Sequence, residues 1–168
     1  MPQLLFSQNG KPYFDAKYGV YFSVTHTDNM VAVSVSDKRC VGVDAEIEIS
    51  DDRAARLESR FFSGLSISVR SLDVIYSFGA ITGIGETIIV DSADKDFLSI
   101  SVADKQVFKV DQNDSFSARW TLYEASMKSG GGGFTSLPCL EILLLETKAD
   151  LIKIVTKGST HFVTTAIS

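Results

Sequence analysis

Apolar and polar residues alternate along several short stretches of the chain, and a period of two residues predicts β-strands. Segments 20–24 and 30–36 are rich in β-branched residues, and the polar sequence THTDN separates them, so we expect two strands joined by a turn. The alternation is strictest in VGVDAEIEI, residues 41–49, whose apolar side chains all fall on one face. Further strands are predicted at 86–90, 97–102, 106–110, 140–146, 151–156 and 161–167.

Two other segments carry the signals of α-helices. In DDRAARLESRFF, residues 51–62, acidic residues come first and arginines later, which suits the helix dipole, and Ser50 precedes them as the N-cap. In residues 114–129, side chains four positions apart share one face, and the glycine run 130–133 then ends the helix. A short helix followed by a glycine-rich loop is expected between 64 and 85.

The length of 168 residues predicts one domain spanning 1–168. No repeat and no linker-like change in composition divides the chain. Because most predicted strands follow one another through polar turns, the expected fold class is α+β, with a mainly antiparallel sheet packed against helices.

Composition narrows the classes of function. The formal net charge is -5 at pH 7, which disfavours a nucleic-acid partner, because a phosphate backbone binds a basic surface. No apolar stretch approaches the roughly 20 residues that span a membrane, and the first residues lack the layout of a signal peptide. We therefore expect a soluble, cytoplasmic protein with no membrane partner.

Cysteine and histidine do not predict a metal site. Cys40 and Cys139 have no CxxC spacing and no nearby histidine, so two reduced thiols in the core are expected. His26 and His161 stand far apart in the sequence without a ligand cluster, which argues against zinc.

Two carboxylates on one strand provide the first candidate site. Asp44 and Glu46 are two residues apart in the predicted strand 41–49, so both side chains point to the same side. Unpaired carboxylates repel each other, and a hard cation such as Mg²⁺, which takes oxygen ligands, relieves that repulsion. The alternative is the solvated face of an edge strand.

A third carboxylate lies on the predicted helix 114–129. Trp120, Glu124 and Lys128 share one face, and an aromatic ring, a carboxylate and an ammonium in this order suit a ligand that carries phosphate. The alternative is an ordinary Glu–Lys pair on a solvated helix surface. The predicted turn with Thr25 and His26 offers polar groups to phosphate oxygens, or it is simply a turn.

Several segments carry a further pattern when they are taken in order: GKPYF at 10–14, FSVTHTDNMVAVSVS at 22–36, VGVDAEIE at 41–48, RFFS at 60–63 and WTLYEASMKSGGGGF at 120–134. They resemble the 4′-phosphopantetheinyl transferases of the larger, surfactin-synthetase-activating type. That family carries a G-K-P segment, an S-H-S turn, a G-[IV]-D-x-E strand, an R-F-F-S element and a W-x-x-K-E-x-x-x-K helix, in this order. The resemblance implies the family's fold.

For the carboxylates, the resemblance implies one shared Mg²⁺ ion. Asp44 and Glu46 match the two metal ligands of the family's strand. Glu124 matches the ligand on the helix, which is also the candidate general base. Glu48 matches no functional position of the family. The resemblance thus assigns the carboxylates of the strand and of the helix to one site, which spacing alone does not do.

For the substrate coenzyme A, the resemblance implies contacts from four residues. Lys128 would contact a phosphate, and Thr25 and His26 match the turn that holds the coenzyme's phosphates. Lys11 matches the lysine of the G-K-P segment, which reaches the same ligand. Tyr123 departs from the family, which usually has lysine just before the helical glutamate.

The implied function is Mg²⁺-dependent transfer of the 4′-phosphopantetheine arm from coenzyme A to a serine of an acyl or peptidyl carrier protein. Only nine residues precede Gly10, fewer than in the family, and a homo-oligomer would compensate. The carrier is expected to dock on 61–80 or on the loop after Lys128. The alternatives are a relative that binds coenzyme A or a carrier domain without catalysis, and a plain interaction domain with solvated acids.

Overall fold

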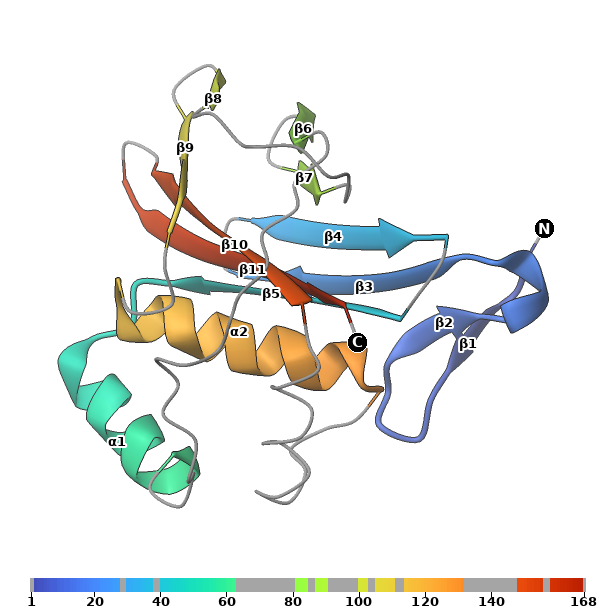
Figure 1. Cartoon of the computed structure of the whole chain (residues 1–168), viewed down its shortest axis with the longest axis horizontal. Helices are drawn as coiled ribbons and strands as arrows, with labels where there is room; N and C mark the ends of the chain where they lie inside the picture. Colours follow the sequence, from blue (N-terminus) through green and yellow to red (C-terminus); the bar gives the residue numbers. More distant parts are fainter. Residues whose placement is uncertain are drawn as a thin grey trace.

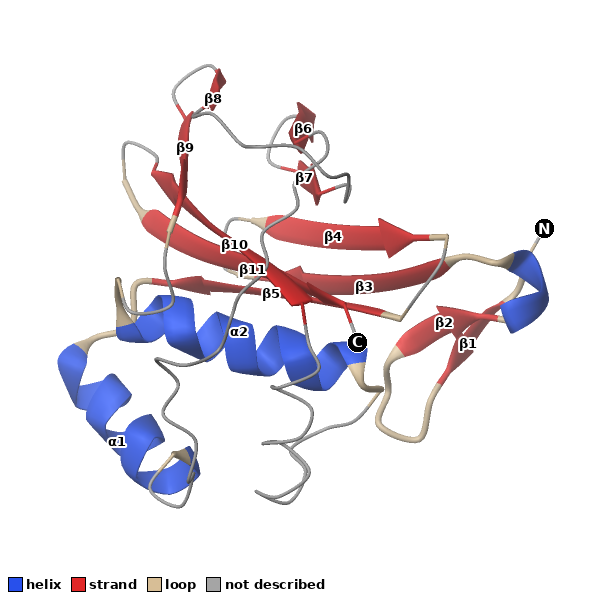
Figure 2. Cartoon of the chain, in the orientation of Figure 1, coloured by secondary structure: helices blue, strands red, loops and turns tan. Residues whose placement is uncertain are grey.

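The computed structural model describes residues 2–27, 30–37, 40–62, 81–84, 87–90, 100–102, 105–110, 114–131, 148–155 and 158–167. Within these ranges, helices and largely antiparallel sheets are combined, which confirms the α+β class (Figures 1 and 2). The predicted strand 140–146 and most of the segment 64–85 lie outside the described residues.

The larger sheet joins strands from distant parts of the chain. In spatial order its strands are β5 (Val41–Ile47), β11 (Thr160–Ile167), β10 (Lys148–Val155), β9 (Lys105–Lys109) and β8 (Ile100–Val102). Every neighbouring pair is antiparallel. β10 and β11 form a hairpin, and β11 then pairs along the whole of β5, with Thr164 opposite Asp44.

A second sheet lies beside the first. Its strands, in spatial order, are β3 (Tyr21–His26), β4 (Val31–Ser36), β7 (Thr87–Val90) and β6 (Ile81–Ile84). β4 and β7 are parallel, and the other pairs are antiparallel. A short hairpin of β1 (Leu4–Phe6) and β2 (Pro12–Phe14) and a 3-10 turn, η1 (Ala16–Tyr18), precede this sheet; none of the three was expected from the sequence.

Both predicted helices are confirmed, as α1 (Asp51–Phe61) and α2 (Phe116–Ser129). Ser50 occupies the N-cap position of α1, but its side chain makes no capping hydrogen bond. α2 has such a bond, because Ser115 Oγ accepts from the backbone N–H of Ala118 at 3.1 Å. Side chains on all sides of α2 are buried, so it is an interior helix and not an amphipathic surface one.

The strand predictions at 20–24, 30–36, 41–49, 151–156 and 161–167 are confirmed with small shifts of their ends. The predicted turn is wrong in one respect: Thr25 and His26 belong to β3. They continue the alternation of that strand, since Thr25 is buried and His26 is exposed. Asp28 and Asn29 lie outside the described residues.

Two layers cover opposite faces of the larger sheet. Ala149 of β10 packs in a cluster with Ala125 of α2, whereas Ile152 of β10 packs in a cluster with Ala32 of β4. Odd-numbered and even-numbered residues of one strand point to opposite faces of the sheet. Therefore α2 covers one face and β3–β4 the other, as Figure 1 shows. Both faces of β5 are therefore buried through most of its length.

α2 approaches β5 at a glycine. A Cβ atom at Gly42 would lie 1.9 Å from the carbonyl oxygen of Ala125 and 2.5 Å from the backbone nitrogen of Ser129. Only a residue without a side chain fits beneath the helix there. This contact fixes the distance between the two elements that carry the predicted carboxylates.

Two further expectations concern membranes and thiols. None of the helices among the described residues has both the length and the apolar character to cross a membrane. Cys40 is a free, exposed thiol directly before β5, so its placement in the core was wrong. Cys139 lies outside the described residues.

Candidate functional site

Asp44 lies in the middle of β5, on the face that α2 covers. It is only 2 % exposed. A carboxylate so far from water is costly unless charges or hydrogen bonds compensate for the lost hydration. The solvated-edge alternative is therefore wrong for Asp44, because α2 and the neighbouring strand β11 enclose it.

Glu124 and Lys128 reach Asp44 from α2, one helical turn apart. Their side chains are 24 % and 32 % exposed. Near its start α2 is tied to the end of β5 because Ser117 Oγ accepts a 2.7 Å hydrogen bond from the backbone N–H of Ile49. With Gly42 admitting the helix farther along, α2 lies close along β5.

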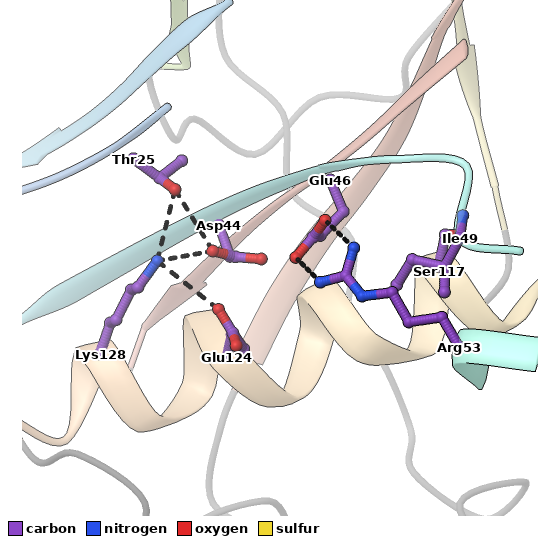
Figure 3. A network of polar contacts seen from close by, with 8 residues as sticks. All are labelled: Thr25, Asp44, Glu46, Ile49, Arg53, Ser117, Glu124 and Lys128. Atoms are coloured by element: carbon purple, nitrogen blue, oxygen red, sulfur yellow. Dashed lines mark hydrogen bonds and ion pairs between the residues drawn. The ribbon is translucent and has the colours of Figure 1, made fainter. Parts of the chain in front are cut away.

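The ammonium of Lys128 is at the centre of this group (Figure 3). Its Nζ lies 2.5 Å from Asp44 Oδ1 and 4.0 Å from Glu124 Oε2. It also donates to Thr25 Oγ1 at 3.4 Å, and that hydroxyl donates to Asp44 Oδ1 at 3.3 Å. The structure thus brings together four of the predicted site residues, from β3, β5 and α2.

The second oxygen of Asp44 is buried without a hydrogen-bond partner. Buried carboxylate oxygens normally accept hydrogen bonds or bind a cation, since an unsatisfied one costs about 1–3 kcal/mol or more. Lys128 satisfies Oδ1 only. Oδ2 therefore lacks a hydrogen bond inside the interface between β5 and α2, where the carboxyl group of Glu124 is the neighbour that interacts with Asp44.

The carboxyl group of Glu124 is perturbed by the same surroundings. Burial raises its pKa from 4.5 to about 7; the negative charge of Asp44 adds to this rise and the ammonium of Lys128 opposes it. Between those pH values the folded protein holds a proton that the unfolded chain has released. By linkage, this group makes the protein less stable as pH rises through that window.

Glu46, the second predicted ligand on β5, does not join the pair. Its Oε1 and Oε2 lie 3.3 and 3.5 Å from the guanidinium nitrogens of Arg53 on α1 (Figure 3). Burial raises the pKa of Glu46, while the charge of Arg53 lowers it and that of Asp44 raises it. Arg53 thus holds this carboxylate away from the other two.

Among the described residues, no three carboxylate, imidazole or thiol groups lie close enough together to hold a metal ion as they stand. Two of the three predicted ligands, Asp44 and Glu124, do meet, and the orphaned Asp44 oxygen fits a hard cation in chemical type. Glu46 would have to exchange Arg53 for the metal. The donor set is all oxygen, which suits Mg²⁺.

The three other residues predicted to contact coenzyme A, which lie on β3 and in the segment before β2, point in different directions. Thr25 faces Asp44 and Lys128, whereas His26 points to the opposite, exposed side of β3. Lys11 turns inward: its ammonium donates to the backbone carbonyls of Val41 at 3.0 Å and of Lys128 at 2.5 Å. Lys11 therefore ties the first residue of β5 to the end of α2.

Trp120 does not line the site, although it shares a predicted helix face with Glu124. It is 3 % exposed and packs in an aromatic cluster with Phe61 and Phe62 at the end of α1, at ring-centroid distances of 5.5 and 5.9 Å. The interpretation of Trp120 as a contact for a phosphate-bearing ligand was wrong. The ring instead holds α1 against the first half of α2.

Sequence reasoning missed two residues that shape the site. Arg53 binds Glu46. The only signal for this in the sequence is that Arg53 lies in the first turn of the helix that follows the strand. Gly42 lies at the site of closest approach between β5 and α2, and its signal was a glycine inside a strand, which often marks close backbone approach.

Comparison with known proteins adds no relative. No protein-family model matches the chain, and no curated protein matches it. The resemblance to the phosphopantetheinyl transferases therefore depends on the ordered sequence motifs alone.

Proposed function

We propose that this protein has the fold of the 4′-phosphopantetheinyl transferases and transfers the phosphopantetheine arm of coenzyme A to a carrier-protein serine in an Mg²⁺-dependent reaction. One observation carries the proposal. Asp44 and Glu124 meet across β5 and α2 around the Lys128 ammonium, with one buried Asp44 oxygen unpartnered. This arrangement suits a hard cation next to a phosphate.

The carboxylates would hold the cation. Asp44 and Glu124 are already adjacent, and Glu46 would complete the set after leaving Arg53. A bound Mg²⁺ ion would neutralise the charge that develops on the pyrophosphate oxygens and on the leaving 3′,5′-ADP. Lys128, on the same side of α2, would pair with a phosphate oxygen of coenzyme A.

The remaining chemistry is a proton transfer and a displacement. The serine oxygen attacks the phosphorus nearer the pantetheine, the bond from that phosphorus to the bridging oxygen breaks, and 3′,5′-ADP leaves. Glu124 would accept the serine proton, directly or through a water molecule. Positioning by the rigid contact between β5 and α2 would supply much of the remaining rate.

The test is incubation with coenzyme A, Mg²⁺ and an apo carrier protein, followed by intact-mass spectrometry of the carrier. We expect a gain of one phosphopantetheine, and a loss of rate of about 100-fold or more in Glu124→Gln. Glu48→Gln is the matched control, because Glu48 is an exposed carboxylate just beyond the end of β5. No mass gain on any of several carriers would refute the proposed activity.

A second candidate is a protein that binds coenzyme A or a carrier domain without catalysis. The observation that favours it is Tyr123, which is 1 % exposed and lies 4.3 Å from the ring of Phe62. At this position the resembled family usually has a lysine, so an expected cation is replaced by a core aromatic. A coenzyme A-dependent rise in melting temperature without any transfer to carriers would support this candidate.

A further inference from the structure

The ammonium of Lys128 occupies the place where the two predicted metal ligands of different elements meet. It forms a charge-assisted hydrogen bond with Asp44 Oδ1 at 2.5 Å and lies 4.0 Å from Glu124 Oε2. In the absence of a metal ion it is the cation that compensates the buried charge of Asp44. The ammonium therefore stands in for the cation that the carboxylates would otherwise bind.

An ammonium and a divalent cation do not share these oxygens easily. Mg²⁺ binds oxygen at about 2.0–2.1 Å and demands near-octahedral geometry, and an adjacent positive charge repels it. Asp44 Oδ1 is already committed to Lys128, and only Oδ2 is free of hydrogen bonds. Full ligation by Asp44 and Glu124 thus requires that the ammonium moves away.

Lys128 is able to move without unfolding the helix. Its side chain is 32 % exposed, it lies in the last turn of α2, and the four-carbon stem of lysine is flexible. Its backbone stays in place, because the Lys128 carbonyl accepts a hydrogen bond from the half-buried Lys11. A displaced ammonium would remain tethered within one side-chain length of the metal and exposed to an anion.

We propose that Lys128 is a tethered cation that leaves Asp44 and Glu124 when a divalent metal binds, and that this displacement presents its ammonium to the phosphate of the incoming ligand. The inference rests on the proposed metal site. It predicts an order of events: the free protein keeps its carboxylates neutralised internally, and the anion-binding lysine becomes available only after metal binding.

The first test measures the affinity for Mg²⁺ alone, by isothermal titration calorimetry without any phosphate. Lys128→Met should bind Mg²⁺ roughly tenfold more tightly than the wild type, the factor that about 1.4 kcal/mol of lost competition gives. Lys17→Met removes the same charge from a side chain that is 65 % exposed, and should leave the affinity unchanged.

The second test uses only the wild-type chain, so it remains valid if Lys128→Met fails to fold. Brief acetylation followed by peptide mass spectrometry measures the reactivity of Lys128 relative to Lys17. We expect Lys128 to be protected in metal-free protein and to become several-fold more reactive with Mg²⁺, while the reactivity of Lys17 stays constant.

The outcomes separate the inference from the proposed function. If the wild type binds Mg²⁺ and Lys128 stays protected, or if Lys128→Met binds Mg²⁺ no more tightly, the displacement is refuted and the metal site stands. If neither the wild type nor Lys128→Met binds Mg²⁺, the metal site fails and the inference fails with it.

Discussion

The contact between Gly42 and α2 gives the sharpest test of how the site is held together. In Gly42→Ala, the new Cβ would lie 1.9 Å from the carbonyl oxygen of Ala125. Ordinary van der Waals contact begins at 3.4 Å, so the helix would have to retreat by about 1.5 Å. The clashing atoms belong to the helix backbone, so no rotamer change relieves the contact.

The expected cost follows from overpacking. Inserting a methyl group into a packed interior costs about 1–3 kcal/mol, and a clash with backbone belongs at the upper end of that range. For a chain of this size, about 3 kcal/mol lowers the melting temperature by roughly 6–12 °C. A retreat of α2 would also break the 2.5 Å contact between Lys128 and Asp44.

Urea denaturation at pH 7 measures the change in the free energy of unfolding. Gly158→Ala is the matched control, because a Cβ there meets nothing within 4 Å, and we expect it to change stability by less than about 0.5 kcal/mol. If Gly42→Ala unfolds at the same urea concentration as Gly158→Ala, the close approach of α2 to β5 is refuted. The explanation for the meeting of Asp44 and Lys128 would then fail as well.

Three other predictions concern single interactions. The wild type should lose up to about 3 kcal/mol of stability between pH 4.5 and 8 relative to Glu124→Gln, because only the wild type carries the Glu124 carboxyl with its pKa raised to about 7; the same change of stability with pH in both proteins, measured by urea denaturation, would contradict this. Lys11→Met should cost about 2 kcal/mol in chemical denaturation, since two part-buried hydrogen bonds to backbone carbonyls are lost, and an effect as small as that of Lys17→Met would exclude the tie between β5 and α2. Ser115→Ala should cost about 1 kcal/mol and Ser50→Ala much less, because only Ser115 makes a capping hydrogen bond; equal melting temperatures for the two variants would argue against the cap.

Much of the secondary structure could be predicted from local pattern. The alternation in 41–49 predicted β5, and the dipole-ordered charges of 51–62 predicted α1, because both signals depend only on neighbouring residues. The pairing of β5 with β11 could not be predicted, since nothing local relates two strands so far apart in the sequence. The short hairpin of β1 and β2 was missed because three-residue strands carry almost no period.

The site shows the same division between local and tertiary information. The sequence by itself determined that Asp44 and Glu46 point to one side of a strand and that Glu124 and Lys128 lie one helical turn apart, because backbone geometry fixes those directions. The elements that cover the strand decided the surroundings of each carboxylate: α2 encloses Asp44, whereas Arg53 on α1 forms an ion pair with Glu46.

The tertiary structure also decided the surroundings of the site. It buried Trp120 among aromatic rings, turned Lys11 inward and placed the ammonium of Lys128 between Asp44 and Glu124. The positions of Lys11 and Lys128 depend on how closely α2 approaches β5. That distance is set by the missing side chain of Gly42 and by packing around it, which no period along the chain encodes.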